Sequence, residues 1–245
     1  MRFMLILAYD GTAYQGWQIQ DKGLTIQAEV EKAMFRICCK HVRIHGAGRT
    51  DAGVHALGQV AHFDSPQGFE HIPWQRALNS VLPHNIRIVD CREAARDFHA
   101  RFCALTKEYF YTLWISSAFF YPQRRNFVWN TGHLEIQPMK EAAGRLLGTH
   151  DFTSFMNKGT QIKDTTRTIL DISFQTGSFP QELVLSIRAS GFLKQMARNI
   201  VGVLVQAGRN RLSPSDISSI LQSRDRTLAP ATAPARGLCL ARVEY

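Results

Sequence analysis

The first half of the chain alternates between stretches that fit strands and stretches that fit helices. Apolar residues run through 3–9 and stop at the Asp10-Gly11 turn, which is typical of a strand. A helix is predicted after Thr25, a good N-cap, because apolar side chains then recur at helical spacing: Ile26, Val30, Ala33, Met34 and Ile37. The other expected elements are a second helix from Pro73 to Pro83 and strands at 42–44, 59–63 and 86–91. The order β-α-β-β-α-β is that of ferredoxin-like (split βαβ) domains.

The second half repeats this order. Strands are predicted at 106–115, 168–174, 183–189 and 238–243, and helices at 139–147 and 193–205. Ser213-Pro214-Ser215-Asp216 has the form of a capping box, so a short extra helix should follow it. We therefore expect an α+β protein with two ferredoxin-like halves, 1–100 and 101–245, hinged near 93–105. A cleft between two such halves is a natural ligand site.

Charge and cysteine usage narrow the class of protein. Lys and Arg number 29 against 20 Asp and Glu, a net charge of +9, which favours a polyanionic partner such as nucleic acid, although the same charge also serves ordinary solubility. Five cysteines without a C-x-x-C pair argue against a disulfide framework or a zinc ribbon. The apolar run 3–9 is too short for a signal peptide or a membrane span. We expect a cytoplasmic protein that does not enter the membrane.

A glycine-rich stretch, 46–55, contains one carboxylate, Asp51, with Arg49 two residues before it. The dinucleotide fingerprint G-x-G-x-x-G is not met because Asp51 stands at its third glycine, and no Gly-Lys-Ser/Thr follows to make a P-loop. An aspartate here could simply form a turn by bonding its own backbone. The functional alternative is a nucleophile, a base or a ribose contact, kept ionised by a nearby arginine.

Two further positions are candidates for chemistry. Tyr109 and Tyr111 share one face of a strand, where aromatic residues either fill a core or stack on RNA bases. Arg198 lies at the flank of the apolar stripe of the helix 193–205, at ~100° per residue, and could be solvated. If it instead points into a cleft, its guanidinium can pair with Asp51.

Metal and nucleophile motifs are incomplete. His133-Leu134-Glu135 matches half of a zinc deaminase signature, but no P-C-x-x-C follows. Cys39 and His41 lack further partners at ligand spacing, and there is no G-x-S-x-G elbow. We expect no metal, and we interpret His55 and His62 as structural or RNA-facing.

Several motifs together resemble the tRNA pseudouridine synthase A family. The central one is Gly48-Arg49-Thr50-Asp51-Ala52-Gly53-Val54-His55, and the others run from the first strand to the last: 9–18, Phe98-His99-Ala100-Arg101-Phe102, 148–155, 196–202 and 232–238. The similarity therefore covers nearly the whole chain.

The resemblance implies a fold, a reaction and a set of residues. The fold would be a pseudouridine-synthase-type sheet with a central cleft, and the reaction the isomerisation of uridine to pseudouridine at tRNA positions 38, 39 and 40 in the anticodon stem-loop. Asp51 matches the catalytic nucleophile, Tyr109 the tyrosine that contacts the flipped base, and Arg198 the arginine paired with the aspartate. RNA contacts would come from Arg49, Arg101 and His55. The resemblance implies no cofactor and a homodimer that holds tRNA.

Two other functions stay open at this point. A non-catalytic RNA-binding or tRNA-folding protein could use the same scaffold and charge, but would have no use for Asp51 paired with Arg198. An aspartate-dependent hydrolase of a nucleoside or phosphorylated substrate would release free base or phosphate.

Overall fold

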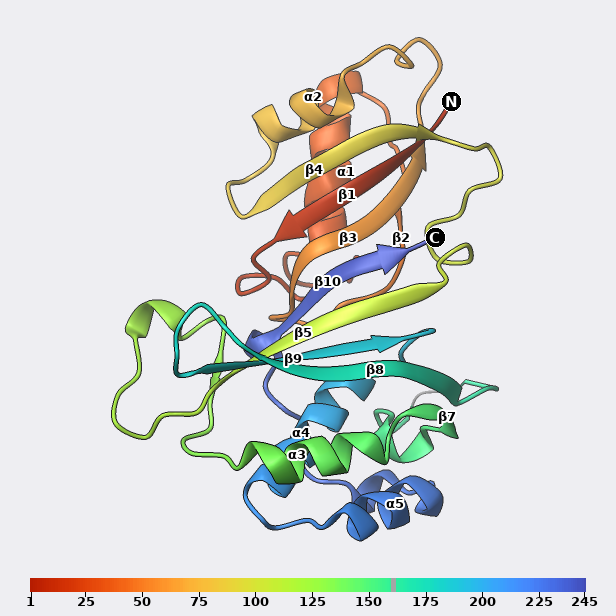
Figure 1. Ribbon diagram of the computed structural model, residues 1–245. Helices are drawn as coiled ribbons and strands as arrows, with labels where there is room; N and C mark the ends of the chain where they lie inside the picture. Colours follow the sequence, from red (N-terminus) through yellow and green to blue (C-terminus); the bar gives the residue numbers. More distant parts are fainter. Residues whose placement is uncertain (160–161) are drawn as a thin grey trace. The chain divides into compact units, whose positions relative to one another are not determined.

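The computed structural model describes residues 1–159 and 162–245. The chain forms two compact units, one made of Met1–Leu105 with Cys239–Tyr245 and the other of Thr106–Leu238. The described residues contain ten strands and five α-helices, which confirms the α+β class (Figure 1).

The first unit has the ferredoxin-like arrangement that the sequence predicts. Its elements are β1 (Arg2–Tyr9), α1 (Ile26–Cys38), β2 (His45–Gly46), β3 (His55–Asp64), α2 (Trp74–Val81) and β4 (Ile86–Ala94). β1 lies between β4 and β3 and is antiparallel to both. β2 is antiparallel to β3, with His45 opposite His62. Both helices pack on one face of this sheet (Figure 1).

Local sequence explains where α1 begins and which face it buries. The Thr25 side chain accepts a hydrogen bond from the Ala28 N–H, as an N-cap should. The predicted apolar stripe is buried against the sheet at Ile26, Val30, Ala33 and Met34. The helix ends where Cys39 adopts a left-handed conformation, with φ 53°.

The last strand of the chain belongs to the first unit. β10 (Leu238–Glu244) runs parallel to β3, with Cys239 opposite His55 and Leu240 opposite Ala56. Nearby, the Leu105 N–H donates to the Glu244 carbonyl, and the Tyr245 hydroxyl donates to the Ala100 carbonyl. The two units thus differ from our halves 1–100 and 101–245, because residues 239–245 group with the N-terminal part.

The second unit contains a twisted, mostly antiparallel sheet with its helices on one side (Figure 1). Its elements are β5 (Thr106–Trp114), β6 (Trp129–Asn130), α3 (Ile136–Gly144), β7 (Gly148–Asp151), β8 (Thr166–Thr176), β9 (Glu182–Ala189), α4 (Met196–Gly208) and α5 (Pro214–Ser223). The strand order is β5-β9-β8-β7, and β6 runs parallel to β5.

Two local features of this unit compare the sequence-based prediction of helix ends with the structure. The capping box before α5 is present, since the Ser213 side chain and the Asp216 carboxylate each accept a backbone N–H of the other residue. In contrast, the periodicity predicted a helix through residue 147, whereas α3 ends at Gly144 and Gly148, at φ 93°, begins β7.

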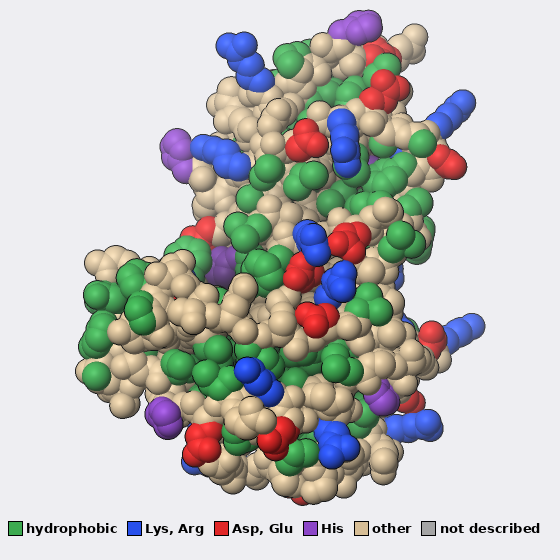
Figure 2. Space-filling view, in the orientation of Figure 1, with side chains coloured by type: hydrophobic (Ala, Val, Ile, Leu, Met, Phe, Trp, Pro, Cys, Tyr) green, Lys and Arg blue, Asp and Glu red, His purple; other side chains and the backbone are tan. Residues whose placement is uncertain are grey.

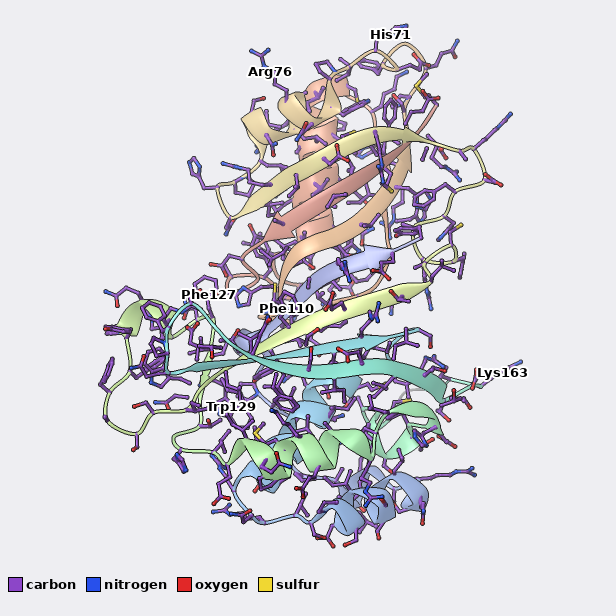
Figure 3. The ribbon with its side chains drawn as sticks, viewed as in Figure 1. His71, Arg76, Phe110, Phe127, Trp129 and Lys163 are labelled. Atoms are coloured by element: carbon purple, nitrogen blue, oxygen red, sulfur yellow. The ribbon has the colours of Figure 1, made fainter. Side chains whose placement is uncertain are left out.

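The connection between β5 and β6 carries a cluster of aromatic rings. Trp114 is buried at its base and contacts Phe119, Phe120 and Tyr121 edge-on. Phe119, Tyr121 and Phe127 are exposed, and Figure 2 shows hydrophobic side chains gathered over this connection. Figure 3 labels Phe127 on the same segment.

Candidate active site

Asp51 stands on a turn that is tied to a second glycine-containing turn, 10–17. The Trp17 N–H donates to the Thr50 carbonyl at 3.1 Å, and the Gly53 N–H donates to the Tyr14 carbonyl at 3.2 Å. These bonds flank Asp51 on both sides. They explain why the segments 9–18 and 48–55 appear together as motifs, because each supplies backbone partners to the other.

Glycine is required where the two turns touch. A Cβ on Gly11 would collide with the Val54 carbonyl, and one on Gly16 would collide with the Thr50 carbonyl. Gly16 also has φ +87°, which L side chains rarely adopt. The close contact of the two backbones therefore fixes the position of the turn that carries Asp51.

Buried side chains support the same turn from beneath. The Tyr9 hydroxyl shares a 2.8 Å hydrogen bond with the Thr50 hydroxyl, and burial raises the pKa of Tyr9 well above its usual value. The Gln59 amide donates to the Gly48 carbonyl at 2.9 Å. The Asp51 side chain is half-buried on this rigid frame. Sequence reasoning missed Tyr9 and Thr50 as supports, although both lie inside the motifs.

Of the two predicted RNA contacts in this loop, His55 is buried and Arg49 is exposed. His55 is 5% exposed, and its Nδ1 accepts the Gly11 N–H at 3.1 Å and lies 3.2 Å from an Asp10 carboxylate oxygen. His55 therefore holds the 10–17 turn in place, which fits its structural interpretation, and a contact of His55 with RNA stays a prediction. Arg49 is exposed and forms no hydrogen bond or ion pair within the described residues, so its guanidinium is available to a ligand.

Tyr109 lies on β5 in the second unit, where it pairs with Ile187 of β9. Tyr109 and Tyr111 are buried and Phe110 is not, as the alternation along a strand predicts (Figure 3). The Tyr109 ring meets Phe192 edge-on, with centroids 4.9 Å apart. Tyr111 donates its hydroxyl to the Pro234 carbonyl at 2.8 Å.

Arg198 is in the first turn of α4 and is half-buried rather than solvated. Its Nε donates to the Ala233 carbonyl at 2.8 Å, and the Ala233 N–H donates back to the Arg198 carbonyl at 3.2 Å. A second contact anchors the same segment, since the Thr232 hydroxyl donates to Asn199 at 2.7 Å. The 232–238 motif therefore orients the guanidinium.

The charge of Arg198 acts on the face of β5 that carries Tyr109. Burial raises the pKa of Tyr111, and the positive charges of Arg198 and Arg236 act in the opposite direction. Tyr111 is two residues from Tyr109 on the same side of the strand. The structure thus brings Arg198 near this face of β5.

The predicted site residues fall in both units. Asp51, Arg49, His55 and Arg101 belong to the first unit, and Tyr109 and Arg198 to the second. The pairing of Asp51 with Arg198 stays a prediction.

Residues 1–159 and 162–245 contain neither a metal-binding cluster nor a membrane-spanning helix. No three His, Cys, Asp or Glu side chains in this part of the chain are arranged to hold a metal ion. No helix in these ranges combines the length and the apolar character that crossing a bilayer requires.

The chain belongs to the tRNA pseudouridine synthase family, whose model matches residues 5–103 and 142–245. A tRNA pseudouridine synthase A of Maridesulfovibrio salexigens is 52% identical over 244 residues, covering 100% of this chain and 90% of the relative. Enzymes of the same name from Solidesulfovibrio magneticus and Geobacillus kaustophilus are 47% and 44% identical, and this chain covers 91% and 94% of them. The solved structure titled "Crystal Structure of a Cbf5-Nop10-Gar1 Complex" aligns with 97% of this chain and 57% of its own at 12% identity, with a TM-score of 0.34, too weak to add to the assignment.

Proposed function

We propose that this chain isomerises uridine to pseudouridine at positions 38, 39 and 40 of the tRNA anticodon stem-loop. The observation that carries the proposal is the half-buried Asp51 carboxylate on a rigid double turn, in a chain that matches the tRNA pseudouridine synthase family over most of its length. A protein that only binds or folds RNA has no need of a carboxylate positioned in this way.

The reaction breaks the C1′–N1 bond, turns the uracil and forms a C1′–C5 bond. The proton on C5 is lost and N1 gains one, so the product is an isomer and needs no oxidant or second substrate. The uracil must leave the helical stack first, which costs a few kcal/mol. In this proposal Arg49, which is exposed, enters the space that the base leaves.

In this proposal Asp51 is the nucleophile, and Arg198 pairs with it so that the carboxylate stays ionised. Tyr109 contacts the extruded uracil. Arg198 is suited to this part because the Ala233 carbonyl already fixes its Nε, which leaves little side-chain freedom to lose.

The proposal is tested with Asp51→Asn, which keeps the shape of the side chain and removes its charge. We expect the variant to bind an unmodified tRNA transcript as wild type does and to release no tritium from [5-³H]uridine-labelled tRNA. Asp21→Asn, on an exposed stretch of the same unit, is the control and should keep full activity. Normal release by Asp51→Asn would contradict the assignment.

The same assay separates the other two functions. A non-catalytic RNA-binding protein would release no tritium even as wild type, and a hydrolase would yield free uracil or phosphate. Transcripts with a single labelled uridine at position 38, 39 or 40 test the location. Release only from uridines elsewhere would contradict the anticodon placement.

We also propose that the protein works as a homodimer in the cytoplasm. The exposed aromatic residues of the β5–β6 connection support self-association, because large apolar side chains gathered on a surface usually mark an interface. The five cysteines are all free thiols, as is usual in a reducing compartment. Sedimentation of wild type should give twice the chain mass of 27.7 kDa, and a single-chain mass at micromolar concentration would contradict the dimer.

A further inference from the structure

Four rings of the first unit form a cluster that leads from the sheet to the surface; we call His45, His62, His99 and Phe102 the ring cluster. His62, on β3, is buried and stacks on His45 with centroids 5.0 Å apart. His99 lies 4.6 Å from His62, and Phe102 lies 4.3 Å from His99. Phe102 is 76% exposed, so the cluster ends on an aromatic residue that is open to solvent.

The turn that presents Phe102 is rigid because the histidines hold its backbone. His99 Nδ1 accepts the N–H groups of Arg101 and Phe102 at 3.1 and 3.3 Å. His62 Nδ1 accepts the Ala100 N–H at 3.1 Å, and the Cys103 N–H donates to the His99 carbonyl at 2.9 Å. A ligand that lands on this turn therefore has little loop entropy to overcome.

His62 and His99 stay uncharged near neutral pH, because the protein lowers the pKa of both rings. Burial, with the charges of His99, His45 and Arg2, lowers the pKa of His62 to about 4. Burial and His45 also lower the pKa of His99. Because both Nδ1 atoms already accept backbone N–H groups, the cluster functions as a support for the turn rather than as a metal site.

One cation lies beside the exposed ring. The Arg101 guanidinium is 5.6 Å from the Phe102 centroid, and both side chains are exposed. An aromatic face with an adjacent arginine is the pair that proteins use to hold unstacked bases, the ring taking the base and the arginine a phosphate.

The same turn is packed against the start of the Asp51 loop. Ala100 is buried in one cluster with Ala47 and Val60, and His45 directly precedes the glycine-rich stretch. The segment that carries Phe102 and the segment that leads to Asp51 therefore pack on one hydrophobic cluster of the first unit.

We propose that Phe102 is a second RNA contact, on which an unpaired tRNA base stacks while Arg101 binds an adjoining phosphate. The proposal rests on tRNA being the substrate of the Asp51 site. Phe102 is thus a positioning residue for the reaction, and it sets how well the RNA is held rather than performing chemistry.

The test measures the Kd of an unmodified tRNA transcript for Phe102→Leu. Loss of one stacked base should raise Kd about 5- to 150-fold, and KM should rise with it while kcat changes much less. Phe102→Trp should restore Kd, because it keeps an aromatic face. Phe35→Leu is the matched control, since Phe35 is also exposed and stacks on a histidine, His41, at 4.8 Å; its Kd should equal that of wild type.

Salt dependence separates the ring from the arginine. Arg101→Gln should lower the slope of log Kd against log salt concentration by about 0.7–0.9, the value for one phosphate contact, and Phe102→Leu should leave the slope unchanged. The control is Arg76→Gln on α2, an exposed arginine that points away from the sheet in Figure 3. It should leave both Kd and slope as in wild type.

Two results would overturn the proposal. One is a Phe102→Leu variant with unchanged melting temperature and a Kd within twofold of wild type. The other is a change in the sedimenting mass of Phe102→Leu, since the ring would then serve a second copy of the chain. Failure of the proposed function is distinguishable, because it appears as absence of pseudouridine with wild type, whatever the Kd of the variants.

Discussion

At the scale of one residue, the burial of His62 makes the stability of the folded protein depend on pH. In the unfolded chain His62 takes up a proton below about pH 6.5, whereas the folded protein keeps it neutral until its lowered pKa of about 4. The unfolded state therefore binds more protons between these values, and stability falls as pH drops from about 6.5 to 4.

His62→Asn should remove this part of the pH dependence, because the asparagine oxygen can still accept the Ala100 N–H but does not ionise. Wild type should lose up to about 3 kcal/mol of unfolding free energy from this group between pH 6.5 and 4. Urea unfolding at half-unit pH steps measures the effect. Equal slopes for wild type and variant over this window would contradict it.

Glu182 is the most deeply buried carboxylate among residues 1–159 and 162–245, and it has an arginine partner. It is 2% exposed, accepts the Arg124 Nε at 2.6 Å and accepts the Ser178 N–H at 3.0 Å. Arg124→Met should destabilise the protein by about 3–5 kcal/mol, since a buried charge loses its counter-ion. Lys32→Met removes the partner of Glu29 on the surface of α1 and should cost less than about 1 kcal/mol. Similar melting temperatures for the two variants would show that the Glu182 charge is not held by Arg124.

At the scale of elements, the decisive feature is the contact between the two glycine turns. Gly16 and Gly68 have nearly the same φ, +87° and +89°, but only Gly16 has a neighbour, the Thr50 carbonyl, where a Cβ would lie. Substituting Gly68 therefore measures backbone strain alone, whereas substituting Gly16 measures the strain together with a steric collision.

Gly68→Ala should cost about 1–2 kcal/mol, the strain of a left-handed alanine, and keep activity. Gly16→Ala should cost more and also lower kcat, because the Thr50 carbonyl must move and takes Asp51 with it. Chemical denaturation and tritium release measure the two effects. Equal loss of stability and activity in both variants would mean that the turn contact does not position Asp51.

Element prediction from the sequence succeeded where a local cause exists. The Thr25 cap and the Ser213 capping box place α1 and α5 by side-chain chemistry, and both are confirmed. Short pieces such as β2 and β7 are set by pairing with β3 and β8, and no local signal marked their limits. The motif around Asp51 could be identified from the sequence because its glycines permit the close backbone contact that the turn requires. The hydrogen bond that holds His55 could not be predicted from the sequence, since its donor is the N–H of Gly11, forty-four residues earlier.

At the scale of the whole molecule, the first unit depends on residues far from it in sequence. β10 supplies Cys239 and Leu240 to pair with β3, and the carbonyl of Glu244 receives the Leu105 N–H. Neither contact could be inferred from periodicity, because a strand pattern does not say which sheet edge it joins.

Removing residues 239–245 should therefore destabilise the first unit selectively. We expect hydrogen exchange to accelerate in β3 and in 98–105, while α4 and β9 keep their protection. Tyr245→Phe, which removes only the hydroxyl bonded to Ala100, should cost about 1 kcal/mol. Uniform acceleration across both units would contradict a local role for the returning strand.

The return of β10 also dictates an order of events during synthesis. Residues 1–105 leave the ribosome first but lack their edge strand until position 245 has emerged, which at about 5–20 residues per second means a wait of several seconds or more. Over that interval the open side of β3 is exposed while the second unit, complete by 238, can already form. The unit that carries Asp51 is thus completed after the second unit, so no nascent chain holds a mature carboxylate site before residues 239–245 have emerged.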